Sequence, residues 1–139
     1  MKTLIQNLKN QVIEASKNTS FLHHDWFIEY HLNLVERISL ELCDIYKDAD
    51  RDIVLTLVWV HDYGKILDMA KEHELNHKAG ELLTELGFSS EFVEKISKYL
   101  EIFESKMTAD LKQAPIEVQI VSSADLSCFS SAGHSHQIS

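Results

Sequence analysis

Apolar residues recur at helical spacing along most of the chain, at i, i+3, i+4 and i+7. Four segments show this pattern: residues 3–17, 31–45, 74–86 and 92–103. Gly87 fits the end of the third segment, because glycine readily adopts the left-handed conformation that closes helices. Ser89 or Ser90 fits the start of the fourth, since a serine side chain caps helix N-termini well.

A different pattern runs from Ile53 to Val60, where Thr56 is the only polar residue. A continuous apolar run of this length is a buried strand or a buried helix, and periodicity alone does not decide. We expect a helix, because no hairpin signal or partner strand stands nearby. The run leads directly into the sequence His-Asp-Tyr-Gly-Lys at residues 61–65, and we expect the helix to end near Gly64 and Lys65.

A last apolar segment follows Pro115 and runs to Ala124, with Asp125 directly after it. Its apolar residues share a helical face, although Ile116, Val118 and Ile120 also alternate and leave a strand as an alternative. The composition changes after Leu126, so we interpret residues 127–139, with five serines, as a loosely held tail. With only one proline and four glycines in the chain, residues 1–126 are expected to form a single-domain, all-α bundle of five to six helices.

Composition narrows the classes of function. A net charge of −9 argues against binding to a nucleic acid polymer or to an anionic membrane. No apolar run is long enough to span a bilayer, and the N-terminus does not resemble a signal peptide. The spacing of Cys43 and Cys128 matches no disulfide framework or zinc finger, so we expect a cytoplasmic protein. A homodimer is left open.

Polar residues with metal-binding side chains lie on or beside the apolar faces. His31 lies four residues before Val35 and seven before Ile38, on the same helical face, and is expected to point inward. A buried imidazole or carboxylate needs a partner, and a divalent cation serves both. Three helices could therefore bring four ligands to one ion: His31, His61, Asp62 and Asp125. Mixed nitrogen and oxygen ligation favours Mn²⁺, Fe²⁺, Co²⁺ or Ni²⁺ over a closed structural zinc site, and Mg²⁺ is kept as a further candidate.

The order His31, His61-Asp62, Asp125, with Gly64 and Lys65 after the doublet, resembles the HD-domain superfamily of metal-dependent phosphohydrolases. The resemblance covers roughly residues 20–126. It implies an HD-domain-like helical fold, ligation of a divalent metal by the same four residues, and hydrolysis of a phosphate ester or anhydride of a small molecule, with nucleotides among the candidates.

The resemblance also implies roles for individual residues. Asp62 would both ligate the metal and orient the attacking water, and Lys65 would neutralise phosphate charge in catalysis and substrate binding. His77, followed by Gly80, matches a pattern of stand-alone members and would contact the substrate. The alternatives are a solvated lysine at a helix end for Lys65 and an ordinary surface histidine for His77.

Several other interpretations remain open. His24-Asp25 is a second doublet, but no apolar run precedes it. His73-Glu74-Leu75-Asn76-His77 fits the zinc-peptidase pattern, in which two histidines one helical turn apart share a zinc and the glutamate acts as the base. A degenerate HD domain that binds metal or nucleotide without catalysis is the main alternative, because we expect only a serine-rich tail after Asp125. A purely structural bundle would leave the four residues dispersed.

Overall fold

The computed structural model describes residues 2–17, 25–61, 63, 77–104 and 114–133. These residues form six helices and no strand. The helices are α1 (Lys2–Lys17), α2 (Asp25–Ile45), α3 (Arg51–Val60), α6 (Lys78–Leu86), α7 (Ser90–Glu104) and α8 (Ile116–Gly133). The all-α prediction is therefore confirmed, and the strand alternatives for 53–60 and 116–120 are wrong.

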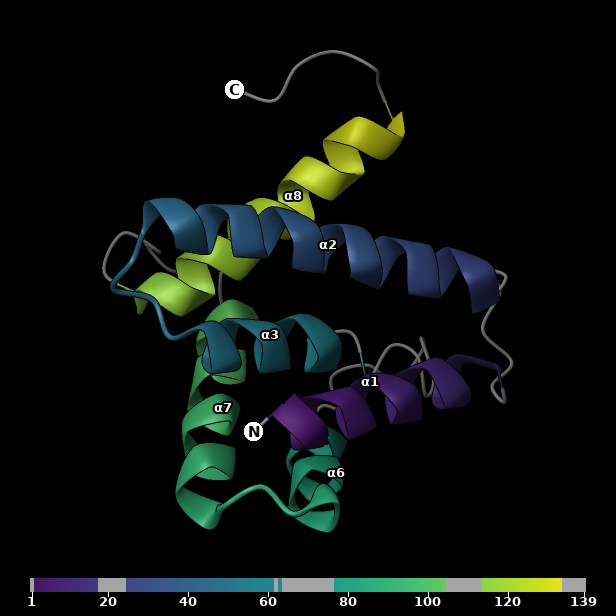
Figure 1. Cartoon of the computed structure of the whole chain (residues 1–139), viewed down its shortest axis with the longest axis vertical. Helices are drawn as coiled ribbons and strands as arrows, with labels where there is room; N and C mark the ends of the chain where they lie inside the picture. The colour runs from purple at the N-terminus through teal and green to yellow at the C-terminus, as the bar shows by residue number, and fades with distance from the viewer. Residues whose placement is uncertain (1, 18–24, 62, 64–76, 105–113, 134–139) are drawn as a thin grey trace.

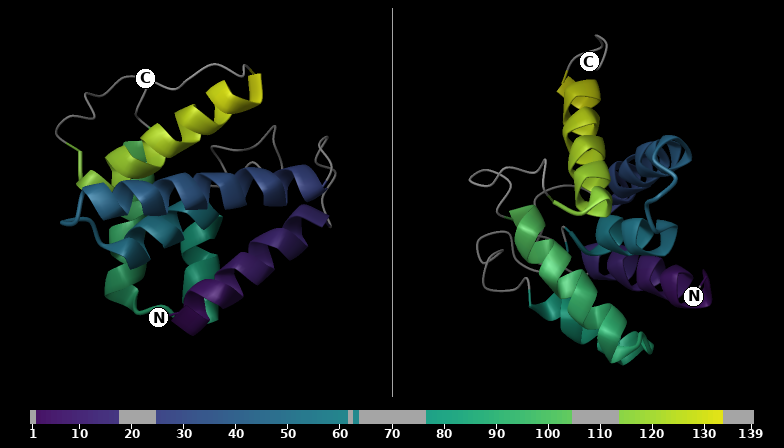
Figure 2. Two further views of the ribbon diagram at one scale, coloured as in Figure 1. Left: turned by 45° about the horizontal axis from the view of Figure 1, so that its top comes forward. Right: turned by 90° about the vertical axis from the view of Figure 1, so that its left-hand side faces the viewer.

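Helix α3 lies at the centre of the bundle. It packs against α1, α2, α7 and α8, with α2 crossing on one side and α1 on the other (Figures 1 and 2). Its residues Val54, Leu57 and Val58 are fully buried, and so is most of Trp59. A helix covered on so many sides reads as a continuous apolar run because almost every one of its positions is buried.

Helix α3 is rich in β-branched residues, which are poor helix formers, so its stability depends on packing and on its ends. The Asp50 side chain caps the N-terminus by accepting hydrogen bonds from the backbone N–H groups of Asp52 and Ile53. The Asp50 N–H donates in turn to the Glu117 carboxylate of α8, at 2.8 Å. At the other end His61 is the C-cap residue, and its N–H donates to the Leu57 carbonyl.

The connection between α6 and α7 has the ends that the sequence predicts. Gly87 has φ of 106°, and the N–H groups of Gly87 and Phe88 bond back to the last turn of α6. The Ser89 hydroxyl accepts from the Phe92 N–H and caps α7. Gly80 allows the two helices to approach closely, because a Cβ there would lie 3.3 Å from Oγ of Ser97.

Several helix boundaries in the structure differ from those expected from the sequence. Helix α2 begins at Asp25 rather than near His31, and α3 ends at Val60, before the expected end near Gly64. Helix α8 continues to Gly133, so the first part of the expected tail is helical. Of the helix expected over 74–86, the described part begins at Lys78.

None of the helices in the described ranges combines the length and the apolar character needed to cross a bilayer. The longest of them, α2 with 21 residues, carries charged residues throughout its length, including Glu29, Glu36, Arg37 and Glu41. Leu32 and Val35 of this helix are fully buried against the bundle, whereas Tyr30 and Ile45 are exposed.

Candidate metal centre

Three helices bring two imidazoles and one carboxylate together inside the bundle. His31 comes from α2, His61 from the C-cap of α3 and Asp125 from α8. Nε2 of His31 lies 3.4 Å from Oδ1 of Asp125, and Nε2 of His61 lies 3.5 Å from the same oxygen. The side chains are 11%, 1% and 9% exposed, respectively. The two histidines therefore lie on the same side of the molecule, with one carboxylate oxygen between them.

The hydrogen bonding of His61 fixes which of its ring nitrogens faces the cluster. Nδ1 of His61 lies 2.6 Å from the Val58 carbonyl oxygen, which can only accept, so Nδ1 carries the proton. In the neutral ring Nε2 then presents a lone pair toward the Asp125 carboxylate. Two acceptors facing each other at 3.5 Å attract a cation, either a proton or a metal ion.

The spacing of these atoms fits a single metal ion. The candidate ligand atoms of the three residues all lie within 4.8 Å of one another. Two ligands at about 2.1 Å from one ion are about 3.0 Å apart at a right angle and about 3.4 Å apart at a tetrahedral angle. The separations of 3.4 and 3.5 Å are close to that range. Two imidazoles and a carboxylate suit Mn²⁺, Fe²⁺, Co²⁺, Ni²⁺ or Zn²⁺.

Phe103 of α7 forms an apolar wall beside the cluster. Its ring meets the His61 ring edge-on, with centroids 5.3 Å apart and an angle of 63° between the planes. Phe103 is almost fully buried, so it keeps water from that face of the imidazole and holds the ring in place. Sequence reasoning placed Phe103 in the apolar stripe of its helix and gave no sign of this contact, since nothing local links it to His61.

Tyr63 lies two residues after His61, half-buried and packed against the core. Its burial raises the pKa of the phenol, and the carboxylates of Glu85 and Glu81 on α6 raise it further. Tyr63 therefore remains neutral near pH 7.

The remaining candidates fall into two groups. Those that lie outside the described residues are His24, Asp62, Lys65, His73 and Glu74, and their roles stay predictions. His77 is described and is not among the three residues that converge. Its side chain is 66% exposed, it precedes α6, and Nε2 lies 3.6 Å from a Glu81 carboxylate oxygen. An exposed histidine outside a regular helix does not fit the buried, helix-borne zinc-peptidase pattern.

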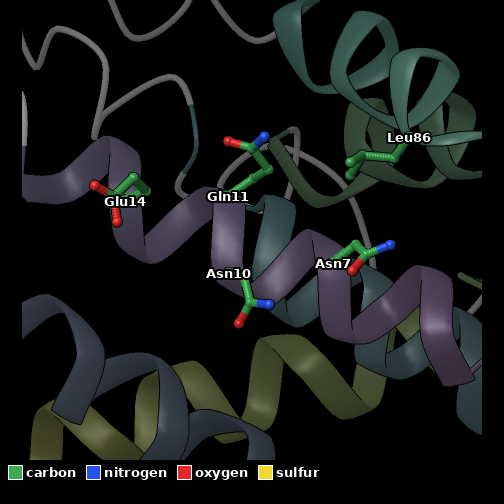
Figure 3. A pocket seen from close by; sticks show the side chains of 5 residues that line it. All are labelled: Asn7, Asn10, Gln11, Glu14 and Leu86. Atoms are coloured by element: carbon green, nitrogen blue, oxygen red, sulfur yellow. The ribbon is translucent and has the colours of Figure 1, made fainter.

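A separate surface cavity of about 330 Å³ lies between α1 and α6. It is lined by Asn7, Asn10, Gln11, Glu14 and Leu86, so it does not include the His–His–Asp cluster. Gln11 and Asn10 project from opposite sides of α1, and the four α1 side chains are exposed (Figure 3). This cavity is therefore not the candidate metal centre.

Comparison with known proteins adds one match. A family model described as HD domain matches residues 28–127, a range that contains His31, His61 and Asp125. No curated protein and no solved structure matches the chain.

Proposed function

The chain belongs to the HD domain family, and from that premise we propose that it is a metal-dependent phosphohydrolase acting on a small phosphorylated molecule. The match confirms the resemblance drawn from the His61-Asp62 doublet and its setting. HD domains are generally hydrolases that use a divalent metal, so the family supports the class of reaction.

One observation carries the proposal for this chain. His31, His61 and Asp125 come from three different helices, yet their candidate ligand atoms lie within 4.8 Å of one another. All three side chains are largely buried. The cluster also lies wholly inside the range that the family model matches.

The described residues prepare the site in distinct ways. His61 is held by its Nδ1–H bond to the Val58 carbonyl, which directs Nε2 inward. Phe103 excludes water from one face of that ring. His31, His61 and Asp125 would hold a divalent cation, and the chemistry that it would supply is Lewis acidity.

Asp62 and Lys65 complete the proposal, and their roles rest on the family resemblance and on their places beside His61. We propose Asp62 as the fourth ligand and as the group that orients the attacking water. Lys65 would offset the charge of the phosphate, which matters in a chain with a net charge of −9. His77 remains a proposed substrate contact; it pairs with Glu81 in the structure.

The test uses the full chain loaded separately with Mn²⁺, Fe²⁺, Co²⁺, Ni²⁺ or Mg²⁺ and assayed on a panel of nucleotides and phosphate esters. We expect turnover in the wild type and its loss in Asp62→Ala and His61→Ala. Glu94→Ala is the matched control, because it removes a carboxylate whose side chain is 72% exposed on α7. Full turnover in Asp62→Ala would refute the proposal.

The same assay separates the alternatives. Metal uptake by the wild type without hydrolysis of any member of the panel would favour a degenerate HD domain that binds metal or nucleotide. A wild type that takes up none of the five metals would favour a purely structural bundle.

A further inference from the structure

Glu36 of α2 joins three helices through a single carboxylate oxygen. Its Oε1 accepts a hydrogen bond from the indole N–H of Trp59 in α3, at 2.8 Å. The same oxygen lies 2.6 Å from Nζ of Lys9 in α1. The Lys9 ammonium also lies 5.7 Å from the centroid of the Trp59 ring, within the range of a cation–π contact.

This group of contacts is close to the candidate ligands along both helices. Glu36 follows His31 by five residues, or about 7.5 Å along α2 at 1.5 Å per residue. Trp59 precedes His61 by two residues, or about 3 Å along α3. The Glu36–Trp59 hydrogen bond therefore crosses the α2–α3 interface within two turns of both imidazoles.

Apolar packing alone gives the α2–α3 interface little directional preference. Leu32 and Val35 of α2 are fully buried, but the hydrophobic effect is non-directional and depends on the apolar area buried. A metal site tolerates errors of only about 0.2 Å in its ligand distances. A hydrogen bond to a carboxylate has a defined length and angle, so it can fix the position of α3 along α2 more closely than apolar packing does.

We infer that Glu36 is a positioning residue for the candidate metal centre, which it serves by fixing α3 against α2 through the Trp59 indole. The inference rests on the proposed function, because it concerns the affinity of the same site. Glu36 itself does not touch the ion. Trp59, only 1% exposed, gains a partner for an N–H that would otherwise be buried without one.

The test is a Co²⁺ titration of the full chain, followed by visible absorption and by calorimetry. We expect Glu36→Ala to weaken Co²⁺ binding about tenfold, the lower end of the effect of losing an outer-shell partner. Trp59→Phe should weaken it similarly, because it removes the N–H donor and keeps an aromatic ring. Glu36→Gln should stay within about twofold of the wild type, because its carbonyl oxygen can still accept from Trp59.

Ser89→Ala is the control for a general loss of stability, since it removes the N-cap of α7, a helix that is not part of the α2–α3 interface. It should lower the urea midpoint and leave the Co²⁺ affinity and absorption spectrum unchanged. Should Glu36→Ala not fold, Trp59→Phe tests the same hydrogen bond. Equal Co²⁺ affinity in the wild type, Glu36→Ala and Trp59→Phe would overturn this inference and leave the proposed function standing. The same holds if Ser89→Ala weakens Co²⁺ binding as much as Glu36→Ala does. A wild type that takes up none of the five metals overturns the proposed function and this inference with it; if it takes up one of the others but not Co²⁺, the same titration is run with that metal.

Discussion

Replacing Asp125 by asparagine should separate metal binding from folding. Oδ1 of Asp125 lies 3.4 Å from Nε2 of His31 and 3.5 Å from Nε2 of His61, so it is the atom that the two imidazoles share. Asp125→Asn keeps the shape of the side chain and removes its charge. The carboxamide introduced there can donate to His61, whose Nδ1 proton is committed to the Val58 carbonyl. We therefore expect the metal-free variant to be about as stable as the metal-free wild type.

The metal-loaded proteins should differ. An ion present at 100 times its Kd stabilises the folded state by about 2.7 kcal/mol. For a chain of 139 residues that corresponds to a rise in Tm of roughly 8–10 °C. Thermal unfolding with and without Co²⁺, Mn²⁺ or Ni²⁺ should show this rise for the wild type. Asp125→Asn should lose it, because a neutral amide is a poor ligand beside two imidazoles.

Asp44→Asn is the matched control. The Asp44 side chain is 74% exposed, and its ion pair with Arg51 is on the surface, so the change should affect neither stability nor the rise with metal. If the metal raises the Tm of Asp125→Asn as much as that of the wild type, the assignment of Asp125 as a ligand is refuted. A metal-free variant many degrees less stable than the wild type would refute the argument that two acceptors face each other there.

Two further predictions follow from single residues. Burial raises the pKa of the Cys43 thiol, so in a Cys128→Ser background thiol labelling at pH 8 should be at least about tenfold slower in the folded chain than in urea. Because the folded state holds the thiol proton of Cys43 more tightly than the unfolded state, the protonated thiol contributes to stability below about pH 8.5. This contribution is lost as the pH rises through the pKa of the folded state. Urea unfolding between pH 7 and pH 10 would detect the loss. Phe103→Ala should lower the free energy of unfolding by about 3 kcal/mol and weaken Co²⁺ binding. Phe103→Leu should retain most of the wild-type stability and most of the wild-type Co²⁺ affinity. An unchanged Co²⁺ affinity in Phe103→Ala would show that the ring has no part in holding His61.

The features that sequence could predict are those carried by local chemistry. Gly87 and Ser89 mark helix ends because a left-handed glycine and a serine cap act within a few residues. His61 ends the apolar α3, and its position at the wall of the core follows from the length of that run. Asp125 shares a helix with the buried Val121 and Ala124, so its inward position was also predictable.

The features that sequence missed depend on distant contacts or on weak local preferences. Helix α8 runs on to Gly133 because serine and alanine cost little inside a helix, so a change in composition need not end one. The contact of Phe103 with His61 joins residues far apart in the chain, and no local pattern encodes it. The close approach of Gly80 to Ser97 of α7 is also a distant contact, and the sequence, which linked Gly80 only to a motif with His77, did not indicate it.

The order of folding and metal binding follows from where the three described ligands lie in the sequence. Residues 31, 61 and 125 are separated by 30 and 64 positions, so closing loops of that length in an unfolded chain costs conformational entropy that one ion would have to offset alone. We therefore expect the ion to bind the chain after it has folded and not to initiate its folding. The bundle is accordingly expected to be stable before the ion arrives, and the burial of α3 on several sides and its cap at Asp50 agree with this. The contacts that fix α3, from Glu36 on α2 and Glu117 on α8, then belong to the metal centre as much as to the fold.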